Sequence, residues 1–256
     1  MGVVEVTPRA ENNVTTHLGD GWTAPETTVV VAGRIGAERR VKVEAEMPTV
    51  EEARAWYDEG DPVHGFDHVL RVLALCERLG GELGADLEIL RAAALLHDAA
   101  GAHPGEGGRE NHQEASADFA RRVLEQEGWE EGHITDVLHC IRAHRFRSRE
   151  APATPEAKIL FDADKLDVMG AFGVARTIGF AVQAGEPVFA EPSPRFLEQG
   201  VGEAGEPHSA YHEYLFKLRR VRERLQTEPG RRLGDRRHAA MTAFFEQLAT
   251  EARGEA

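Results

Sequence analysis

Cysteine and lysine are scarce in this sequence of 256 residues, and long apolar runs are absent. The two cysteines, Cys76 and Cys140, both fall in stretches with helical periodicity, which argues against a disulfide framework. No window approaches the ~18 consecutive apolar residues of a membrane helix. The N-terminal stretch MGVVEVTPRAENN lacks the basic and apolar regions of a signal peptide. We therefore expect a cytoplasmic protein with no membrane partner.

The chain is also poor in positive charge. Acidic residues outnumber basic residues by 44 to 30, which gives a formal net charge of −14. Such a surface repels polyanions, so the composition argues against a nucleic-acid partner. The hydrophobic content of 41% is sufficient for the core of one large domain.

Two regions differ in their hydrophobic pattern. Residues 1–47 contain the alternating stretch TTVVVAGRIGAERRVKVEAEM, which predicts a short β-hairpin extension that could form an edge in a homo-oligomer. Residues 48–252 show helical periodicity, so we expect an all-α helical bundle there. The long segment between residues 184 and 208 suggests a lid or a packed flap. Helices are expected at 49–59, 67–80, 86–99, 111–127, 130–146, 155–168, 171–184, 208–226 and 234–252.

Three polar residues occupy positions on apolar helical faces. His68 shares a face with three apolar residues, His97 ends a second apolar stripe, and Asp164 lies within a third. Asp98 lies about 100° around the helix from His97, at the rim of the same face. A single buried histidine is usually a hydrogen-bonded core residue, but several converging groups need a common partner. A divalent cation would neutralise and coordinate them, with mixed nitrogen and oxygen ligands.

The motifs around these residues resemble a known family. The segments HGFDHVLRV, LLHDAAG, HCIRAHRF and LFDADKLDVMGAFGVAR resemble the HD-domain superfamily of metal-dependent phosphohydrolases, over roughly residues 50–250. The resemblance implies an HD-domain helical bundle in which His68, His97, Asp98 and Asp164 ligate the metal. It selects His68 over His64, and Asp164 over Asp162 or Asp167. It is most similar to small bacterial and archaeal members that act on nucleotides or similar phosphoesters.

Further residues are candidates for contact with substrate. His112 and His144 both lie on apolar faces, so each is either a buried hydrogen-bonding histidine or a group that faces the phosphate. Arg71 follows His68 by about one turn and could contact the phosphate. Asp98, if it ligates only loosely, could act as the base. Lys165 stands where the family frequently has arginine, which weakens any role that needs a bidentate fork.

Four other polar residues have open interpretations. Asp162 and Asp167 flank Asp164 at angles that could bring them against the metal ligands, and a surface position is an equal alternative for Asp167. His208 and His212 lie one turn apart, a spacing that can chelate a metal but that also arises by chance.

We expect one divalent metal ion per chain, with manganese, magnesium, iron, nickel and zinc as candidates. His112 and His144 have no acidic residue on their own stripes, and a second cation would need bridging carboxylates. The expected substrate is a small phosphorylated molecule, such as a nucleotide. Two alternatives stay open: a non-catalytic module that senses nucleotides with a bound metal, and a helical scaffold without metal.

Overall fold

The computed structural model describes residues 48–57, 65–100, 112–145 and 150–255, all of which belong to the second of two units of the chain, residues 43–256. These residues form helices without strands, which confirms the all-α class, and the expected hairpin lies outside them. The helices are α1 (Val50–Arg54), α2 (Phe66–Leu83), α3 (Leu87–Leu96), α4 (His112–Gln126), α5 (Glu131–Ala143), α6 (Pro155–Asp167), α7 (Gly170–Gln183), α8 (Pro194–Gln199), α9 (Ala210–Phe216), the 3-10 helix η2 (Leu218–Arg224) and α10 (Glu228–Ala252).

Local capping accounts for several helix boundaries. The Asp86 side chain accepts hydrogen bonds from the backbone N–H groups of Glu88 and Ile89 and so begins α3. Thr154 caps α6 in the same way, and Pro155 occupies its first position. The expected helix 86–99 is too long at its end, because α3 ends at Leu96 and the His97–Asp98 pair lies in the turn that follows.

Two expected boundaries near the C-terminus are wrong. The helix expected at 208–226 is divided at Lys217 into α9 and η2. The last helix begins at Glu228 rather than at residue 234, since the Thr227 side chain accepts a hydrogen bond from the N–H of Gly230. Pro229 in the first turn is compatible with this start, because an N–H group at this position would have no acceptor within the helix.

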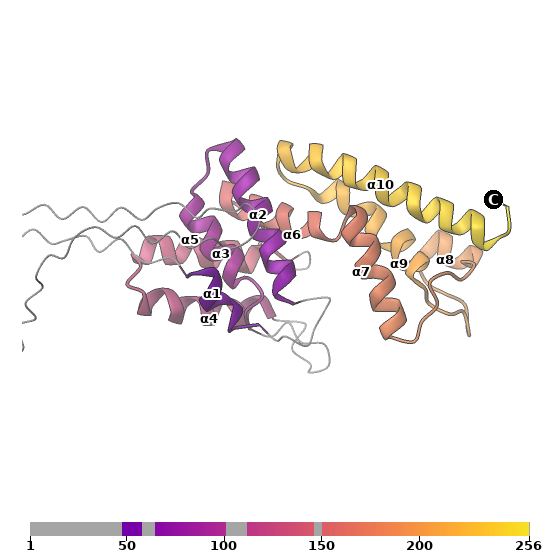
Figure 1. The fold of residues 1–256 in the computed structure, drawn as a ribbon, viewed down its shortest axis with the longest axis horizontal. Coiled ribbons are helices and arrows are strands. Elements are labelled where there is room, and N and C mark those ends of the chain that lie inside the picture. The colour runs from indigo at the N-terminus through magenta and orange to yellow at the C-terminus, as the bar shows by residue number, and fades with distance from the viewer. Residues whose placement is uncertain (1–47, 58–64, 101–111, 146–149, 256) are drawn as a thin grey trace, which may run out of the picture. The chain divides into compact units, whose positions relative to one another are not determined.

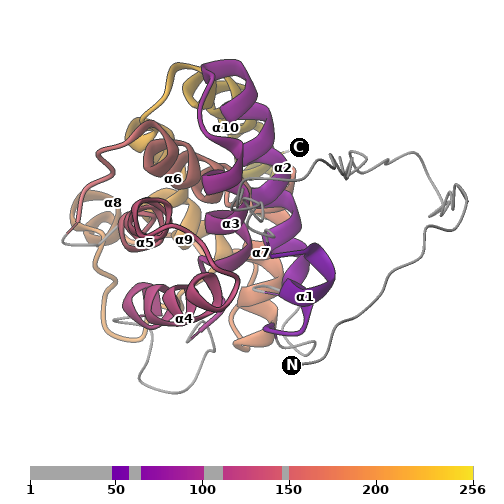
Figure 2. The ribbon, with the colours of Figure 1, turned by 90° about the vertical axis from the view of Figure 1, so that its left-hand side faces the viewer.

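The first hydrophobic core lies among α2, α3, α5 and α6, which pack against one another (Figure 1). Leu79, Leu90, Ile141 and Leu160 are fully buried there, one from each of these helices. α4 packs against α5 at the edge of this group, as the view turned by 90° shows (Figure 2). The side chains of these four helices form this core. Most of the candidate site residues lie at or near the ends of the same helices, and His112 begins α4.

A second core lies among α7, α9 and α10. The rings of Tyr214 and Phe245 stack with centroids 4.5 Å apart, and Met241 is fully buried beside them. α7 follows α6 after a very short turn in which Gly170 has φ of 68°. That backbone conformation favours glycine, and it lets α7 begin directly after Asp167, the last residue of α6.

The segment between α7 and α9 is packed rather than open. The Ser209 hydroxyl donates to Nδ1 of His212 over 2.7 Å, and Nε2 of His212 then donates to Glu206 over 3.0 Å. Glu206 also accepts hydrogen bonds from the backbone N–H groups of Ser193 and Glu203. Because both ring nitrogens of His212 are engaged, the metal-chelating interpretation of His208 and His212 is not favoured.

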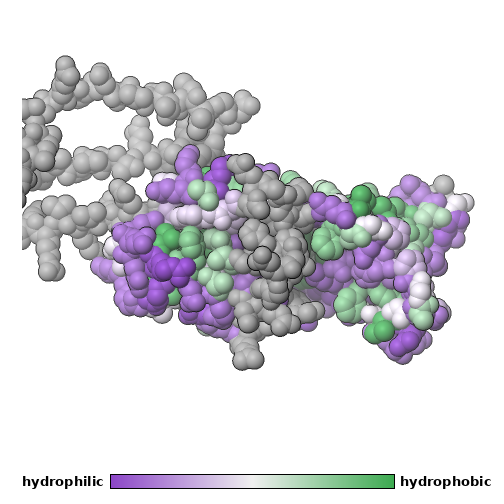
Figure 3. Space-filling view, turned by 90° about the horizontal axis from the view of Figure 1, so that it is seen from below, coloured by the Kyte–Doolittle hydropathy of each residue, from purple (hydrophilic) through white to green (hydrophobic). Residues whose placement is uncertain are grey.

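On the face of the molecule seen in Figure 3, apolar side chains of the described residues lie in separate patches, divided by hydrophilic residues. The exposed aromatic residues of the described ranges include Phe172, Phe180 and Phe216. Within the described ranges, no helix combines the length and the apolar character that crossing a membrane requires.

Candidate metal centre

The described part of the chain contains two groups of three potential metal ligands. The first group is His68, His97 and Asp164, and the second is Asp98, His112 and His144. Within each group, one ligand atom from each residue lies within 4.8 Å of the others. The structure therefore brings together six of the seven residues that the sequence selects as site residues.

The first group is buried and compact. Nε2 of His68 lies 3.4 Å from Nε2 of His97 and 3.4 Å from Oδ1 of Asp164. His97 is completely buried and His68 is 3% exposed, while the Asp164 side chain is 14% exposed. Helix α2, the turn after α3, and helix α6 each contribute one of these residues. The apolar faces of these elements are buried as expected, so the polar residues share one interior space.

Asp98 belongs to the second group and also approaches His97 of the first group. Its Oδ2 is 3.6 Å from Nε2 of His97, and its Oδ1 is 3.4 Å from Nε2 of His112 and 3.5 Å from Nε2 of His144. The Oδ1 atom is buried and accepts no hydrogen bond within the described part of the chain. A buried carboxylate oxygen without a hydrogen bond is costly unless a cation satisfies it. The donor set around Asp98 therefore fits a divalent metal ion.

The hydrogen bonds of the histidines assign their protons. Nδ1 of His97 lies 2.8 Å from the carbonyl oxygen of Ala94, and Nδ1 of His144 lies 2.6 Å from that of Ile141. A carbonyl oxygen only accepts, so each Nδ1 carries the hydrogen and donates it. The Nε2 lone pairs are then directed at the carboxylates and are available to a cation.

His68 is held by a carboxylate instead of a carbonyl. Its Nδ1 lies 2.7 Å from Oδ2 of Asp167, which is fully buried at the end of α6. Asp167 also accepts two hydrogen bonds from Arg71, from Nε over 2.6 Å and from Nη2 over 3.0 Å. Arg176 donates a fourth, from Nη1 over 2.6 Å. The surface alternative for Asp167 is therefore wrong.

Arg71 lies close to the site but is turned toward Asp167. Its two hydrogen bonds hold the guanidinium behind His68, on the Nδ1 side of the ring. The expected contact between Arg71 and a substrate phosphate stays a prediction. Arg176 was not selected from the sequence at all. The sequence does indicate that Arg176 needs an anionic partner, since it is an arginine within the otherwise apolar α7.

Asp162 has a structural position. Its carboxylate accepts hydrogen bonds from the N–H groups of Gln226 and Thr227 and from the Thr227 hydroxyl, over 2.7, 2.8 and 2.6 Å. A Cβ atom at Gly230 would collide with this carboxylate. Asp162 therefore fixes the start of α10 and does not reach the candidate ligands.

The expected face of α4 is wrong by about one residue. Helical spacing from His112 selects Ala115, Phe119 and Val123 as the apolar face on which His112 is expected, but Ala115 is exposed. The buried residues of this helix are Gln113, Ser116, Ala117, Ala120 and Leu124. His112 is the first residue of α4, and its side chain, 17% exposed, approaches Asp98 from the edge of this face.

The charges of the site follow from burial and from these contacts. Burial lowers the pKa of His97 to about 4. Burial also acts to lower the pKa of His68, but hydrogen bonds with Asp164 and Asp167 outweigh it and raise the pKa to about 9. A metal ion at Nε2 would take the place of the proton that Asp164 stabilises there. For Asp98 and Asp164, burial acts to raise the pKa. His97 outweighs this effect at Asp98 and Lys165 outweighs it at Asp164, in each case together with further imidazoles. Both pKa values therefore lie below the usual range. Both carboxylates are ionised at neutral pH, which suits a cation.

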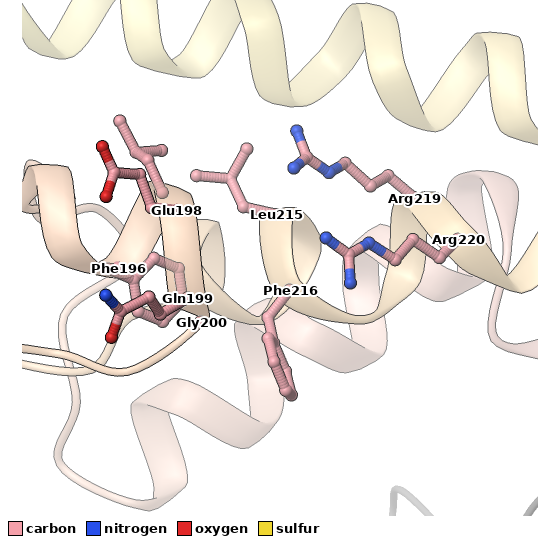
Figure 4. Close-up of a pocket in the computed structure, with 9 residues that line it drawn as sticks. Phe196, Glu198, Gln199, Gly200, Leu215, Phe216, Arg219 and Arg220 are labelled. Atoms are coloured by element: carbon pink, nitrogen blue, oxygen red, sulfur yellow. The ribbon is translucent and has the colours of Figure 1, made fainter.

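A separate cavity of about 80 Å³ lies between α8 and the α9–η2 segment (Figure 4). Phe196, Leu215 and Phe216 form part of its lining, and the side chains of Arg219 and Arg220 point toward it. None of the six candidate ligands lines this cavity. This cavity is therefore not part of the candidate metal centre.

Comparison with known proteins agrees with the motifs. The protein-family model described as the HD domain matches residues 65–169, from the start of α2 to the turn after α6. The Bacillus subtilis protein YpgQ, described as uncharacterized, is 30% identical over 218 residues, which cover 82% of this chain and 96% of YpgQ. The chain belongs to the HD-domain superfamily. Ribonuclease Y of Cutibacterium acnes is 39% identical over only 80 residues, 31% of this chain and 13% of that protein.

Solved structures share the fold of this HD-domain chain. The crystal structure of Bacillus subtilis YpgQ in complex with ADP has a TM-score of 0.60 and 27% identity, covering 79% of this chain and 94% of YpgQ. A crystal structure from Lactobacillus plantarum has a TM-score of 0.60 and 24% identity, covering 80% of this chain and 95% of that chain. The similarity therefore extends beyond the HD domain match into the C-terminal helices.

Proposed function

We propose that this protein is a metal-dependent phosphohydrolase that cleaves a phosphoester or phosphoanhydride bond in a nucleotide. The observation that carries the proposal is the environment of Asp98. Its buried carboxylate has an oxygen without a hydrogen bond, and it faces the Nε2 atoms of three histidines that come from three different parts of the chain. A divalent cation would satisfy the carboxylate and the imidazole lone pairs together.

His68, His97, Asp98 and Asp164 would hold the cation. Their mixed imidazole and carboxylate donors suit manganese, magnesium, iron, nickel or zinc. When bound, a divalent metal supplies Lewis acidity at a phosphoryl oxygen and lowers the pKa of a water molecule. Asp167 orients His68 from behind, and the Ala94 carbonyl orients His97, so both Nε2 atoms are fixed before a ligand arrives.

His112 and His144 would serve the substrate. Nδ1 of His144 donates to the Ile141 carbonyl, which leaves its Nε2 directed at the site, where this atom can accept a proton from the attacking water. His112, at the exposed edge, can contact a phosphate oxygen. The lowered pKa of Asp98 makes its carboxylate a weak base, which favours the histidines over Asp98 for the proton transfer.

The number of cations needs a revised argument. The expectation of one metal rested on the absence of an acidic residue on the helical stripes of His112 and His144. In the structure, Asp98 from the turn after α3 lies 3.4 and 3.5 Å from their Nε2 atoms and could supply a shared carboxylate. We propose one tightly held cation and a weaker second position at Asp98, His112 and His144. The second position is weaker because it shares its only carboxylate and because two divalent ions repel four times more strongly than two single charges.

The nucleotide assignment rests on similarity and on charge. YpgQ, which shares the fold over most of both chains, has been crystallised in complex with ADP. The net charge of −14 opposes binding of a long polyanion such as RNA more than it opposes binding of a mononucleotide at a metal centre.

A hydrolysis screen tests the proposal. Nucleoside mono-, di- and triphosphates and a short RNA would be incubated with the protein and each of five divalent metals, and released phosphate and pyrophosphate measured. We expect turnover of at least one nucleotide, lost in Asp98→Asn and retained in Asp118→Asn, an exposed aspartate on α4. Nucleotide binding without turnover would instead support the sensor alternative, and turnover of RNA alone would contradict the nucleotide assignment.

A further inference from the structure

An aromatic ring lies on the surface beside the candidate metal centre. Phe172, in the first turn of α7, is 51% exposed. The guanidinium carbon of Arg71 lies 4.4 Å from the centroid of its ring, so one face of the ring is covered by a cation. A single exposed apolar ring is common in folded proteins, so the exposure of Phe172 alone marks no site. What distinguishes Phe172 is the Arg71 guanidinium against its ring, because Arg71 also contacts the residues behind the candidate metal centre.

The ring is connected to the metal centre by a continuous set of contacts. Arg71 is held by its two hydrogen bonds to Asp167, and Asp167 is hydrogen-bonded to Nδ1 of His68. Arg71 follows His68 by three residues on α2, about 5 Å along the helix axis. Arg176, one turn after Phe172 on α7, lies 3.3 Å from Nδ1 of His68. Phe172 is therefore linked to the candidate ligand His68 through Arg71 and Asp167.

The charge around the ring suits a phosphorylated ligand. Arg71 and Arg176 carry two positive charges against the single negative charge of Asp167, so these three side chains together carry one net positive charge. The chain as a whole has a net charge of −14, so this positive region would attract an anionic substrate toward the site. An aromatic ring beside it offers a surface for the uncharged part of the same molecule.

We infer that Phe172, backed by Arg71, is the platform on which the base of a nucleotide stacks while its phosphates lie at the histidine and aspartate groups. Every nucleobase has a π face, so such a platform binds bases with little sequence preference. The inference rests on the proposed function, and it gives Arg71 a task that matches its observed position, which is to hold the Phe172 ring.

Phe172→Ala tests the platform, with Phe180→Ala as the matched control. Phe180 lies two turns later on the same helix and is 45% exposed. The dissociation constants of ADP and of inorganic pyrophosphate would be measured by calorimetry with manganese present. We expect Phe172→Ala to weaken ADP binding by about tenfold, as loss of one stacking contact does. Pyrophosphate has no base, so its affinity is expected to stay the same.

Two further variants separate stacking from apolar contact. Phe172→Trp keeps an aromatic face and is expected to retain ADP affinity, whereas Phe172→Leu keeps an apolar side chain and is expected to lose it. Unchanged ADP affinity in Phe172→Ala, an equal loss for pyrophosphate, or an equal loss in Phe180→Ala would overturn the platform alone. If the wild-type protein binds neither ADP nor pyrophosphate with any divalent metal, the proposed function fails and the platform with it.

Discussion

At the scale of single residues, the candidate site depends on carboxylates that orient histidines. Asp167 is the clearest example, since it is fully buried and accepts hydrogen bonds from His68, Arg71 and Arg176. It touches no candidate ligand atom on the cation side of His68. Its effect on a cation would therefore be indirect, through the orientation and basicity of the His68 ring.

Asp167→Asn is expected to reduce metal affinity by about 10- to 100-fold, the range found when a group that orients a metal-bound histidine is replaced. The amide removes the negative charge that two guanidinium groups share, but it keeps the size of the side chain. Competition with a metallochromic indicator would measure the affinity, and circular dichroism would check the fold. An unchanged affinity in a folded variant would contradict this account of Asp167.

His144→Ala separates catalysis from metal binding. We expect turnover to fall by about a hundredfold, as for loss of a positioned acid or base, while the tightly held cation is retained. The weaker second position is expected to disappear. Titration with manganese, followed by electron paramagnetic resonance, would count both positions. Loss of the tight cation in this variant would show that His144 is one of its ligands.

Residue-level prediction from sequence was good where a side chain lies on a regular helix and poor where tertiary contacts decide. His68 and Asp164 were identified from the apolar stripes of their own helices, and both face the site. Arg176 was missed because its partner Asp167 is on another helix. The contact of Asp98 with His112 and His144 depends on the turn after α3, where helical periodicity says nothing.

At the scale of elements, close approaches between neighbouring helices fix the frame around the site. Gly230 in the first turn of α10 lies against the Asp162 carboxylate of α6, and this contact anchors α10 beside α6. Most helices were predicted from periodicity and caps. The start of α10 was missed because the apolar pattern begins later than the Thr227 cap.

Gly230→Ala is expected to lower the free energy of unfolding by about 1–3 kcal/mol, the usual cost of overpacking, because the new Cβ would collide with Asp162. Gly81→Ala in α2 is the control. A Cβ there meets nothing within 4 Å, so we expect a change between zero and a gain of about 1 kcal/mol from helix propensity. Urea unfolding would measure both. Equal effects in the two variants would contradict the proposed packing role.

The segment before α9 is expected to lose stability in acid. Hydrogen bonds from Ser193, then from Glu203 and His212, lower the pKa of Glu206 from 4.5 to about 2. A carboxyl group with a depressed folded pKa stabilises the fold above its unfolded pKa, and this contribution is lost as pH falls from about 4.5 toward 2. Glu206→Gln should therefore show a smaller loss of stability than wild type between pH 5 and pH 3. Parallel pH dependence in both proteins would show that this carboxylate does not contribute.

At the scale of the whole molecule, the sequence predicted the class of fold and the family but not the arrangement of the C-terminal helices. The second core, with Met241, Tyr214 and Phe245, places α7 beside α10, and α7 carries Phe172 and Arg176. The HD domain match ends at residue 169, so both residues lie beyond it. The C-terminal helices therefore contribute to the surroundings of the candidate site as well as to stability.

The most direct test of the central claim, that the buried histidines and aspartates hold a divalent cation, is the metal content of the purified protein. Inductively coupled plasma mass spectrometry after loading and desalting is expected to show about one tightly held divalent metal per chain. Asp164→Asn is expected to lose most of it while staying helical, and Asp118→Asn is expected to keep it. A wild-type protein that retains no divalent metal, or an Asp164→Asn variant that retains all of it with full activity, would contradict the account.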